Sequence, residues 1–409
     1  MTGGEIRRTK IRPLKRIEKK NFRLKLQKKM GNSSNKSYHH PRRKYASQVN
    51  RFFQAKLFRS FGALDDNLGS SKTVWPVARS EAMFLPEFKV RTDPRETNYS
   101  FLKLIARGAY GRVYKVENRS NGQIYALKMI SKAKIVEEDA VGQVKQEVSI
   151  QEVVGHHPFV ARTLEHWQGR KTLYIMMDYF GGGELMSLIE DYGCLPEAAV
   201  RIHVGELGTA LDFLHNAGIV HRDVKAANVL LDHEGHAVLI DFGLAKWLRP
   251  TQRTSTFCGT LEYMAPEIVK KNYYGHEVDW WSLGILACFA LTNQYPCIQE
   301  LPESSDSPST QQQHEYVILP SSPELSNAAK DLLRRLLQPD PRTRLKSVLG
   351  LQRIAFYMGH DIRRYVSKEL SPLRLLGRKI GSSSAPLSSS EQQRFRDFDS
   401  FAAGSTDRA

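Results

Sequence analysis

Residues 220–228 read Val-His-Arg-Asp-Val-Lys-Ala-Ala-Asn, and residues 241–243 read Asp-Phe-Gly. Transfer of a phosphoryl group from ATP requires a carboxylate that orients the attacking hydroxyl, ligands for Mg²⁺, and a cation for the developing charge. Asp223 fits the first role and Lys225 fits the last. Asn228 and Asp241 fit the role of metal ligands. The order and spacing of these residues therefore predict a site for phosphoryl transfer.

A glycine-containing turn upstream fits the binding of nucleotide phosphates. It follows an alternating strand at residues 102–106 and reads Arg-Gly-Ala-Tyr-Gly-Arg-Val over residues 107–113. Glycines allow backbone amides to approach phosphates closely, and Val113 would cover the adenine. The usual pattern is Gly-x-Gly-x-x-Gly-x-Val, and Ala106 stands here at its first glycine. Taken alone, the turn is equally compatible with an ordinary hairpin.

Three further segments complete the predicted nucleotide site. Residues 125–128, Tyr-Ala-Leu-Lys, match the Val-Ala-Ile-Lys pattern whose lysine binds the α- and β-phosphates. Glu147 on the following helix is the expected partner of Lys128, with Glu152 as a rival. An apolar strand at residues 173–179 leads into a hinge along which adenine would form hydrogen bonds, with Glu184 near the ribose or a substrate cation. The residues expected to contact ATP are Ala106, Gly108, Gly111, Val113, Ala126, Lys128, Glu147, Asp178, Phe180 and Glu184.

The net charge of the chain is concentrated at its N-terminus. Of the 409 residues, the first 60 contain 19 Lys or Arg and 2 Asp or Glu, whereas the remainder contains 41 of each. The four cysteines lack the spacing of metal ligands, so reduced thiols are expected. No apolar run approaches the roughly 20 residues of a membrane-spanning helix, and no signal peptide is evident. A cytoplasmic protein is expected, with a nuclear or peripheral-membrane location as alternatives.

The composition divides the chain into four parts. Residues 1–60 are predicted to be a basic, disordered arm, and residues 61–98, with Pro76, Pro86 and Pro94, are predicted to be a linker. Residues 99–356 have the character of a folded domain. Residues 357–409 form a C-terminal tail with a Ser-rich stretch and an aromatic cluster at its end.

Together these motifs resemble the eukaryotic protein kinases over residues 99–356. Lys225, two residues after Asp223, is typical of serine/threonine kinases. Residues 256–267, Thr-Phe-Cys-Gly-Thr-Leu-Glu-Tyr-Met-Ala-Pro-Glu, resemble the AGC group, and within it the branch of ribosomal-protein-S-six kinases. The resemblance implies a two-lobed α+β fold with a small antiparallel-sheet lobe at 99–178 and a large helical lobe at 179–356. It also implies ATP and Mg²⁺ as cofactors, a protein substrate and a monomer.

The same resemblance makes Thr256 the regulatory phosphorylation site. Its phosphate would carry about −1.5 to −2 charge and would order the loop against cations. Arg222 and Lys246 match the positions that bind it. The family has a histidine four residues before the helix glutamate, and Gln143 stands there in this chain. We therefore expect weak coupling between Thr256 phosphorylation and the position of the Glu147 helix.

The tail resembles the hydrophobic motif of AGC kinases. It carries Phe395 and Phe398, and Asp399 stands where many members have a phosphorylated residue, as in protein kinase C-related kinases. By this resemblance the motif would dock beside the Glu147 helix or recruit phosphoinositide-dependent kinase-1. The alternative is a disordered tail with a chance aromatic cluster.

Several departures from the AGC pattern bear on substrates and on activity. Ala227 and Phe289 stand where arginine-selective members have acidic residues, so we expect weak selection for upstream arginine. Leu261 replaces the usual proline, and Cys297 a phenylalanine. These changes favour a rival interpretation, a pseudokinase that serves as a scaffold or adaptor. The intact Lys128, Asp223, Lys225, Asn228 and Asp241 argue against it.

The basic arm leaves three functional interpretations open. Residues 6–29 contain twelve Lys or Arg interspersed with Ile, Leu and Phe. They could contact an anionic membrane surface, bind nucleic acid, or direct nuclear import. The apolar residues form no clean helical stripe, which weakens the membrane interpretation. A solvated arm with non-specific affinity for polyanions is the fourth possibility.

Overall fold

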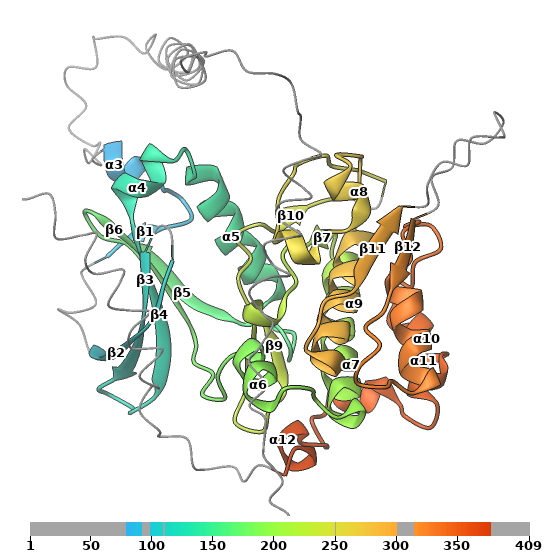
Figure 1. Ribbon diagram of the computed structural model, residues 1–409. Coiled ribbons are helices and arrows are strands. Elements are labelled where there is room, and N and C mark those ends of the chain that lie inside the picture. Colours follow the sequence, from blue (N-terminus) through green and yellow to red (C-terminus); the bar gives the residue numbers. More distant parts are fainter. Residues whose placement is uncertain (1–78, 92–98, 109–110, 250, 301–314, 378–409) are drawn as a thin grey trace, which may run out of the picture. The chain divides into compact units, whose positions relative to one another are not determined.

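The computed structural model describes residues 79–91, 99–108, 111–249, 251–300 and 315–377, which belong to one compact unit that begins at Val77 (Figure 1). These residues form a small lobe around a six-stranded sheet and a larger, mainly helical lobe. The predicted two-lobed α+β fold is thereby confirmed. Within the described ranges, no helix has the length and apolar character needed to cross a membrane.

The sheet of the small lobe is antiparallel except at one edge. Its strands are β1 (Lys89–Val90), β2 (Tyr99–Arg107), β3 (Gly111–Asn118), β4 (Ile124–Ser131), β5 (Thr163–Gln168) and β6 (Thr172–Asp178). They lie in the order β1-β5-β6-β4-β3-β2, and β1 pairs with β5 in parallel. Because side chains alternate along a strand, β4 places Leu127 in the core and presents Lys128 on the opposite face.

Two helices follow β4 and pack against the sheet. They are α4 (Lys132–Glu137) and α5 (Val141–Val154). The buried residues Val144 and Val148 lie one turn apart on α5 and share a core with residues of β4 and β6. This packing leaves Glu147 on the side of α5 that meets Lys128.

The short segment at residues 79–91 belongs to this lobe. It contains α3 (Arg79–Ala82) and β1, and both Phe84 and Phe88 are fully buried in the core beneath α4 and α5. The sequence favoured a linker over residues 61–98, and that prediction is wrong for residues 79–91. Its prolines suggested a spacer, but two aromatic side chains remove enough apolar surface from water to fix the segment in place.

The large lobe is built around α7 and α9. Its helices are α6 (Leu185–Tyr192), α7 (Glu197–Asn216), α8 (Pro266–Val269), α9 (Glu277–Thr292), α10 (Asn327–Leu336), α11 (Val348–Gln352) and α12 (Pro372–Leu375), with 3₁₀ turns η2 (Ala226–Asn228), η3 (Leu261–Tyr263), η4 (Ala355–Tyr357) and η5 (Ile362–Tyr365). Three two-stranded sheets complete it, formed by β7 (Ile219–Val220) with β10 (Lys246–Trp247), β8 (Val229–Leu231) with β9 (Ala237–Leu239), and β11 (Cys297–Glu300) with β12 (Glu315–Ile318).

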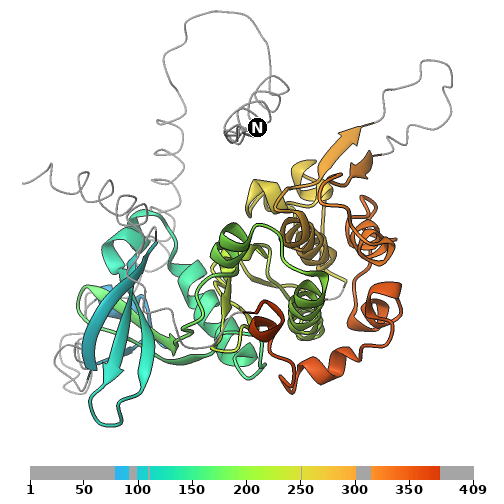
Figure 2. The same ribbon diagram turned by 60° about the horizontal axis from the view of Figure 1, so that its bottom comes forward.

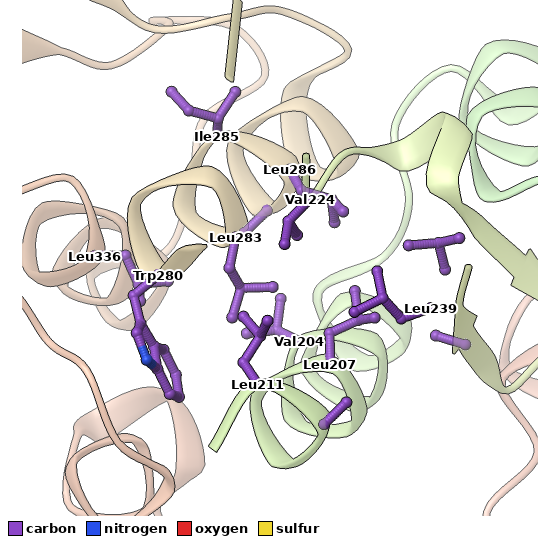
Figure 3. Close-up of a cluster of buried hydrophobic side chains, with 14 of the residues drawn as sticks. Val204, Leu207, Leu211, Val224, Leu239, Trp280, Leu283, Ile285, Leu286 and Leu336 are labelled. Atoms are coloured by element: carbon purple, nitrogen blue, oxygen red, sulfur yellow. The ribbon is translucent and has the colours of Figure 1, made fainter. Parts of the chain in front are cut away.

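Helix α9 is apolar on all sides because it is surrounded by protein. All of its residues from Val278 to Thr292 are buried. Figure 3 shows side chains of α7 and α9, among them Leu211 and Leu283, in this core. Gly284 allows a close approach to α10, since an added Cβ would lie 2.8 Å from the Cβ of Leu336.

The first part of the predicted tail is packed on the large lobe. Residues 357–377 contain η5 and α12, both of which contact α7 (Figure 2). Tyr365 is buried, and Lys368 forms an ion pair with Asp232 at 2.9 Å. The folded body therefore continues to residue 377, beyond the boundary at residue 356 that the sequence suggested.

Candidate active site

The loop that follows β7 is held by a carboxylate from α9. Oδ1 and Oδ2 of Asp279 accept hydrogen bonds from the backbone amides of Arg222 and His221, both at 2.8 Å. Burial would raise the pKa of Asp279, but hydrogen bonding and the charges of His215 and His221 hold this pKa below its usual value. The carboxylate thus fixes the backbone of residues 221–222, where Arg222 has a φ of 69°. Asp279 therefore braces the loop that carries Asp223.

Asp223 lies at the centre of a hydrogen-bonded cluster. Its Oδ2 accepts from Lys225 Nζ at 2.7 Å and from Asn228 Nδ2 at 2.9 Å. Its Oδ1 accepts from the hydroxyl of Thr260 at 2.7 Å. Lys225 Nζ also donates to Thr260 Oγ1 at 2.8 Å, which closes a ring of contacts around the carboxylate. The structure therefore brings together Asp223, Lys225 and Asn228 as the sequence predicted.

This cluster keeps Asp223 ionised. Burial would raise the pKa of Asp223, but the hydrogen bonds from Lys225, Thr260 and Asn228 lower it below its usual value. Asp223 is 8% exposed, so its carboxylate is almost fully removed from water. Thr260 was not predicted as part of this site, because it lies 37 positions beyond Asp223 and no local pattern ties it to that carboxylate.

Asp241 and Phe242 occupy opposite environments. Asp241 is exposed with a left-handed φ of 64°, and its Oδ1 accepts from Gly243 N at 3.3 Å. Phe242 is buried, and its ring meets that of His221 edge-on with centroids 4.9 Å apart. The buried phenyl ring fixes the turn, and the turn directs the Asp241 carboxylate to solvent beside Lys128, whose pKa it influences.

Lys128 pairs with Glu147 and not with Glu152. Lys128 Nζ lies 2.5 Å from Glu147 Oε1, and Glu147 is buried. Glu152 is exposed and lies 3.5 Å from His166. Burial would lower the pKa of Lys128, but the charges of Glu147 and Asp241 raise it above its usual value. The ammonium therefore stays protonated on the face where a phosphate would bind.

The predicted adenine and phosphate residues lie on neighbouring strands. Val113 of β3 is opposite Lys128 of β4, and Ala126 of β4 is opposite Met177 of β6. In the turn, Gly108 N donates to Gly111 O at 2.9 Å, and a Cβ at Gly111 would lie 1.9 Å from a backbone oxygen. This position therefore requires glycine.

The remaining nucleotide residues lie at the two ends of this surface. Ala106 pairs with Val113 across β2 and β3. Asp178 ends β6, and burial raises its pKa. Phe180 follows it, and Glu184 forms a β-bridge to Leu230, just beyond the Asp223 loop. The hinge is therefore anchored to the segment that carries Asn228.

Two amide side chains join α5 to the segment after Phe242. Gln143 Nε2 donates to Gly243 O at 2.7 Å, and Gln146 Nε2 donates to Ala245 O at 2.6 Å. Both bonds are to neutral backbone carbonyls. The position of α5 relative to this segment is thus held without a charged group.

Thr256 is exposed, and the two predicted phosphate-binding cations lie one contact away from it. Lys246 Nζ donates to Thr254 Oγ1 at 3.1 Å, and this hydroxyl oxygen lies 3.3 Å from Thr256 Oγ1. Arg222 contacts the hydroxyl of Tyr274 at 3.4 Å, and this hydroxyl donates to Thr256 O at 2.6 Å. Phe395, Phe398 and Asp399 lie outside the described residues. The face of α5 that they were predicted to approach is covered by residues 79–91.

A buried ion pair holds Glu267, which follows the loop that carries Thr256. Arg344 donates to both carboxylate oxygens of Glu267, at 2.7 and 3.0 Å. The Arg344 side chain is fully buried and stacks over Trp281 at 5.2 Å. The pair connects residues 77 positions apart.

The sequence of this chain is similar to those of known proteins. The protein kinase domain family matches residues 99–353. The chain is 39% identical over 285 residues to the human ribosomal protein S6 kinase-related protein, which covers 70% of this chain and 68% of the relative. It is 40% identical over 259 residues to human ribosomal protein S6 kinase alpha-4, covering 61% of this chain and 33% of that protein. It is also 35% identical over 280 residues to the RAC family serine/threonine-protein kinase homolog of Dictyostelium discoideum, covering 67% and 61% respectively.

Proposed function

The chain belongs to the protein kinase family and is a serine/threonine protein kinase, and on this premise we propose roles for its individual residues. Asp223 orients the hydroxyl of a serine or threonine in a protein substrate and accepts its proton. Lys225 stabilises charge on the transferred group. Lys128, held by Glu147, anchors ATP. The observation that carries this proposal is the ring of contacts that keeps the Asp223 carboxylate ionised and fixed.

Asn228 and Asp241 fit Mg²⁺ as ligands. Mg²⁺ prefers carboxylate and amide oxygens and retains several waters. The amide nitrogen of Asn228 is engaged with Asp223, which leaves its oxygen as the free ligand atom. Among the described residues, the exposed Asp241 carboxylate accepts one weak bond, from Gly243 N. When bound, Mg²⁺ neutralises charge on the ATP phosphates.

The scaffold alternative gains no support from the described residues. Pseudokinases usually lose at least one catalytic group, whereas here Lys128 retains its partner and Asp223 retains its full cluster. Ala106, the departure at the first glycine, pairs normally with Val113 in the strand register. The substitution is thus compatible with the geometry that nucleotide binding needs.

We also propose that substrate selection relies little on upstream arginine. Phe289 stacks on Tyr295 with centroids 4.8 Å apart, and Tyr295 meets Tyr263 edge-on at 5.7 Å. Phe289 and Tyr263 are both buried, so these positions, together with Ala227, offer no carboxylate where arginine-selective relatives have acids. A peptide library scanned at each upstream position tests this, and strong selection for arginine at two positions would contradict it.

The remaining proposals concern the aromatic motif near the C-terminus and the basic residues at the N-terminus. Since residues 79–91 cover the outer face of α5, we propose that Phe395, Phe398 and Asp399 recruit phosphoinositide-dependent kinase-1 and do not dock on α5. Residues 1–60, with 19 basic and 2 acidic residues, would bind a polyanion, either an anionic membrane or nucleic acid. Flotation with anionic vesicles, in the presence and absence of competing nucleic acid, separates these two partners.

The decisive experiment measures phosphate transfer from Mg-ATP to a mixed serine/threonine peptide library. Wild type is compared with Asp223→Asn, which keeps the size of the side chain and removes its charge. Transfer by wild type and its loss in the variant are expected. Equal background from both proteins, with Mg-ATP binding intact, would refute the catalytic role of Asp223.

A further inference from the structure

Residues 79–91 fill a hydrophobic site on the outer side of α5. Phe84 and Phe88 are both 0% exposed, and their rings meet edge-on with centroids 6.4 Å apart. They pack with Val144 and Val148 of α5 and with Ile135 of α4. A stretch that precedes the kinase domain therefore supplies core residues to the helix that carries Glu147.

Buried polar side chains of the lobe find their partners in this segment. Gln168 is fully buried, and its Nε2 donates to Glu81 O at 3.0 Å and to Phe88 O at 2.5 Å. Lys132 is 4% exposed and donates to Ser80 O at 3.1 Å and to Gln168 Oε1 at 2.6 Å. Buried polar groups are costly without hydrogen bonds. The site is thus built to hold a peptide backbone, in addition to two aromatic rings.

The segment is also bonded directly to α5. Lys145 Nζ donates to Leu85 O at 2.7 Å and forms an ion pair with Glu87 at 2.7 Å. Lys145 precedes Glu147 by two residues, so any shift of this turn of α5 would change the distance between Glu147 and Lys128. The opposite side of α5 bonds to the segment after Phe242. The helix is therefore fixed between two segments that are far apart in the sequence.

We propose that residues 79–91 act as an intramolecular positioning segment, which holds α5 where Glu147 engages Lys128 and thereby makes the kinase competent. This inference rests on the ATP-anchoring role of Lys128 proposed above. It predicts that the chain carries its own activating ligand, and that displacement of this segment lowers activity without change to any residue that contacts substrate.

The test uses the full-length chain with Phe84→Ala and Phe88→Ala together. Turnover is expected to fall about 100-fold, because misplacement of a catalytic group by about 1 Å lowers the rate by this factor. A synthetic peptide of residues 79–91 added to the folded variant is expected to restore most of the activity. The same peptide with alanine at both phenylalanine positions is the control and is expected to have no effect.

A second variant keeps the test independent of folding. Lys145→Met severs the bonds to Leu85 and Glu87 and leaves both phenylalanines in place, so a several-fold loss of kcat with an unchanged Tm is expected. Phe356→Ala, which removes a buried ring of the large lobe, is the matched control for general destabilisation, and the peptide should not affect it.

Two results would overturn the proposal. One is wild-type turnover by the folded double variant. The other is a loss that saturating peptide does not restore and that Lys145→Met does not share, because residues 79–91 would then contribute to stability alone. Asp223→Asn run in parallel separates these results from failure of the proposed function, since that variant must be inactive whether or not the segment matters.

Discussion

Thr260 offers the sharpest test of how this site works. Its hydroxyl donates to Asp223 Oδ1 at 2.7 Å and accepts from Lys225 Nζ at 2.8 Å, so it links the two catalytic side chains. Thr260→Ala removes this link and leaves the backbone unchanged. Thr260→Ser retains the hydroxyl and is the matched control.

The magnitude follows from the charged character of the lost bond. A hydrogen bond to an ionised group contributes about 1.5–3 kcal/mol, and each 1.36 kcal/mol corresponds to tenfold in rate. If the bond orients Asp223 in the transition state, kcat for Thr260→Ala should fall about 10- to 100-fold. The KM for ATP should change little, because Thr260 is not among the residues predicted to contact the nucleotide.

The pH profile gives a second readout that general destabilisation would not produce. Burial raises the pKa of Asp223, whereas the hydrogen bonds from Lys225 and Thr260 lower it, and the lowering prevails. Removal of one donor therefore raises this pKa. The ionised form that accepts the proton is then lost at a higher pH, and the acid limb of the kcat/KM profile moves upward.

The assay is steady-state phosphorylation of one peptide substrate across a pH series. A kcat for Thr260→Ala within twofold of wild type, together with an unmoved acid limb, would refute the inference that Thr260 positions Asp223. Thr260→Ser should behave as wild type in both respects. A loss shared by the serine variant would show that the methyl group, and not the hydroxyl, is responsible.

Three further predictions concern stability and metal binding. Arg344→Met should lower the free energy of unfolding, measured in urea, by about 3–5 kcal/mol, because Glu267 is left as a buried charge without a partner. The control Arg342→Ala removes an exposed cation and should change this free energy little. Burial lowers the pKa of His203 to about 4, so below pH 6.5 the folded state binds fewer protons than the unfolded state. The free energy of unfolding should therefore fall by up to ~3 kcal/mol as the pH drops from about 6.5 towards 4. Urea titrations of His203→Gln should lack this part of the acid loss. Chelation of Mg²⁺ should abolish phosphate transfer reversibly, and Asp241→Asn should raise the Mg²⁺ concentration required for half-maximal activity.

The catalytic residues were predictable because they are close in sequence. Asp223, Lys225 and Asn228 lie within six positions, so their spacing alone brings them together once the turn forms. The partner of Lys128 was harder to predict, since two glutamates lie on the same helix. Five residues along an α-helix correspond to a rotation of about 140° from the starting face. Glu147 and Glu152 therefore point in different directions, and only the packing of α5 decides which one meets the lysine.

Contacts between distant segments could not be read from the sequence. Thr260 reaches Asp223 across 37 positions, and no local pattern marks the pair. Phe84 and Phe88 stand four positions apart on either side of Pro86, and this spacing does not show which part of the fold would cover them. Their burial depends on a site formed by α4, α5 and the sheet. Local composition indicates how a segment behaves alone, and it fails where the stabilising partner lies elsewhere in the fold.

The position of α5 shows why these distant contacts matter for activity. The Lys128 side chain is about a quarter exposed and that of Glu147 is buried, so the cost of desolvating the two charges offsets much of their attraction. The pair of Lys128 with Glu147 is therefore too weak to hold a helix of 14 residues by itself. The larger contribution comes from burial of Phe84 and Phe88, at about 1.5–3 kcal/mol each. The side-chain amides of Gln143 and Gln146 add two hydrogen bonds that involve no charged group. None of these requires a phosphate at Thr256, so dephosphorylated protein should retain most of its activity, and a 100-fold loss after phosphatase treatment would contradict this reasoning.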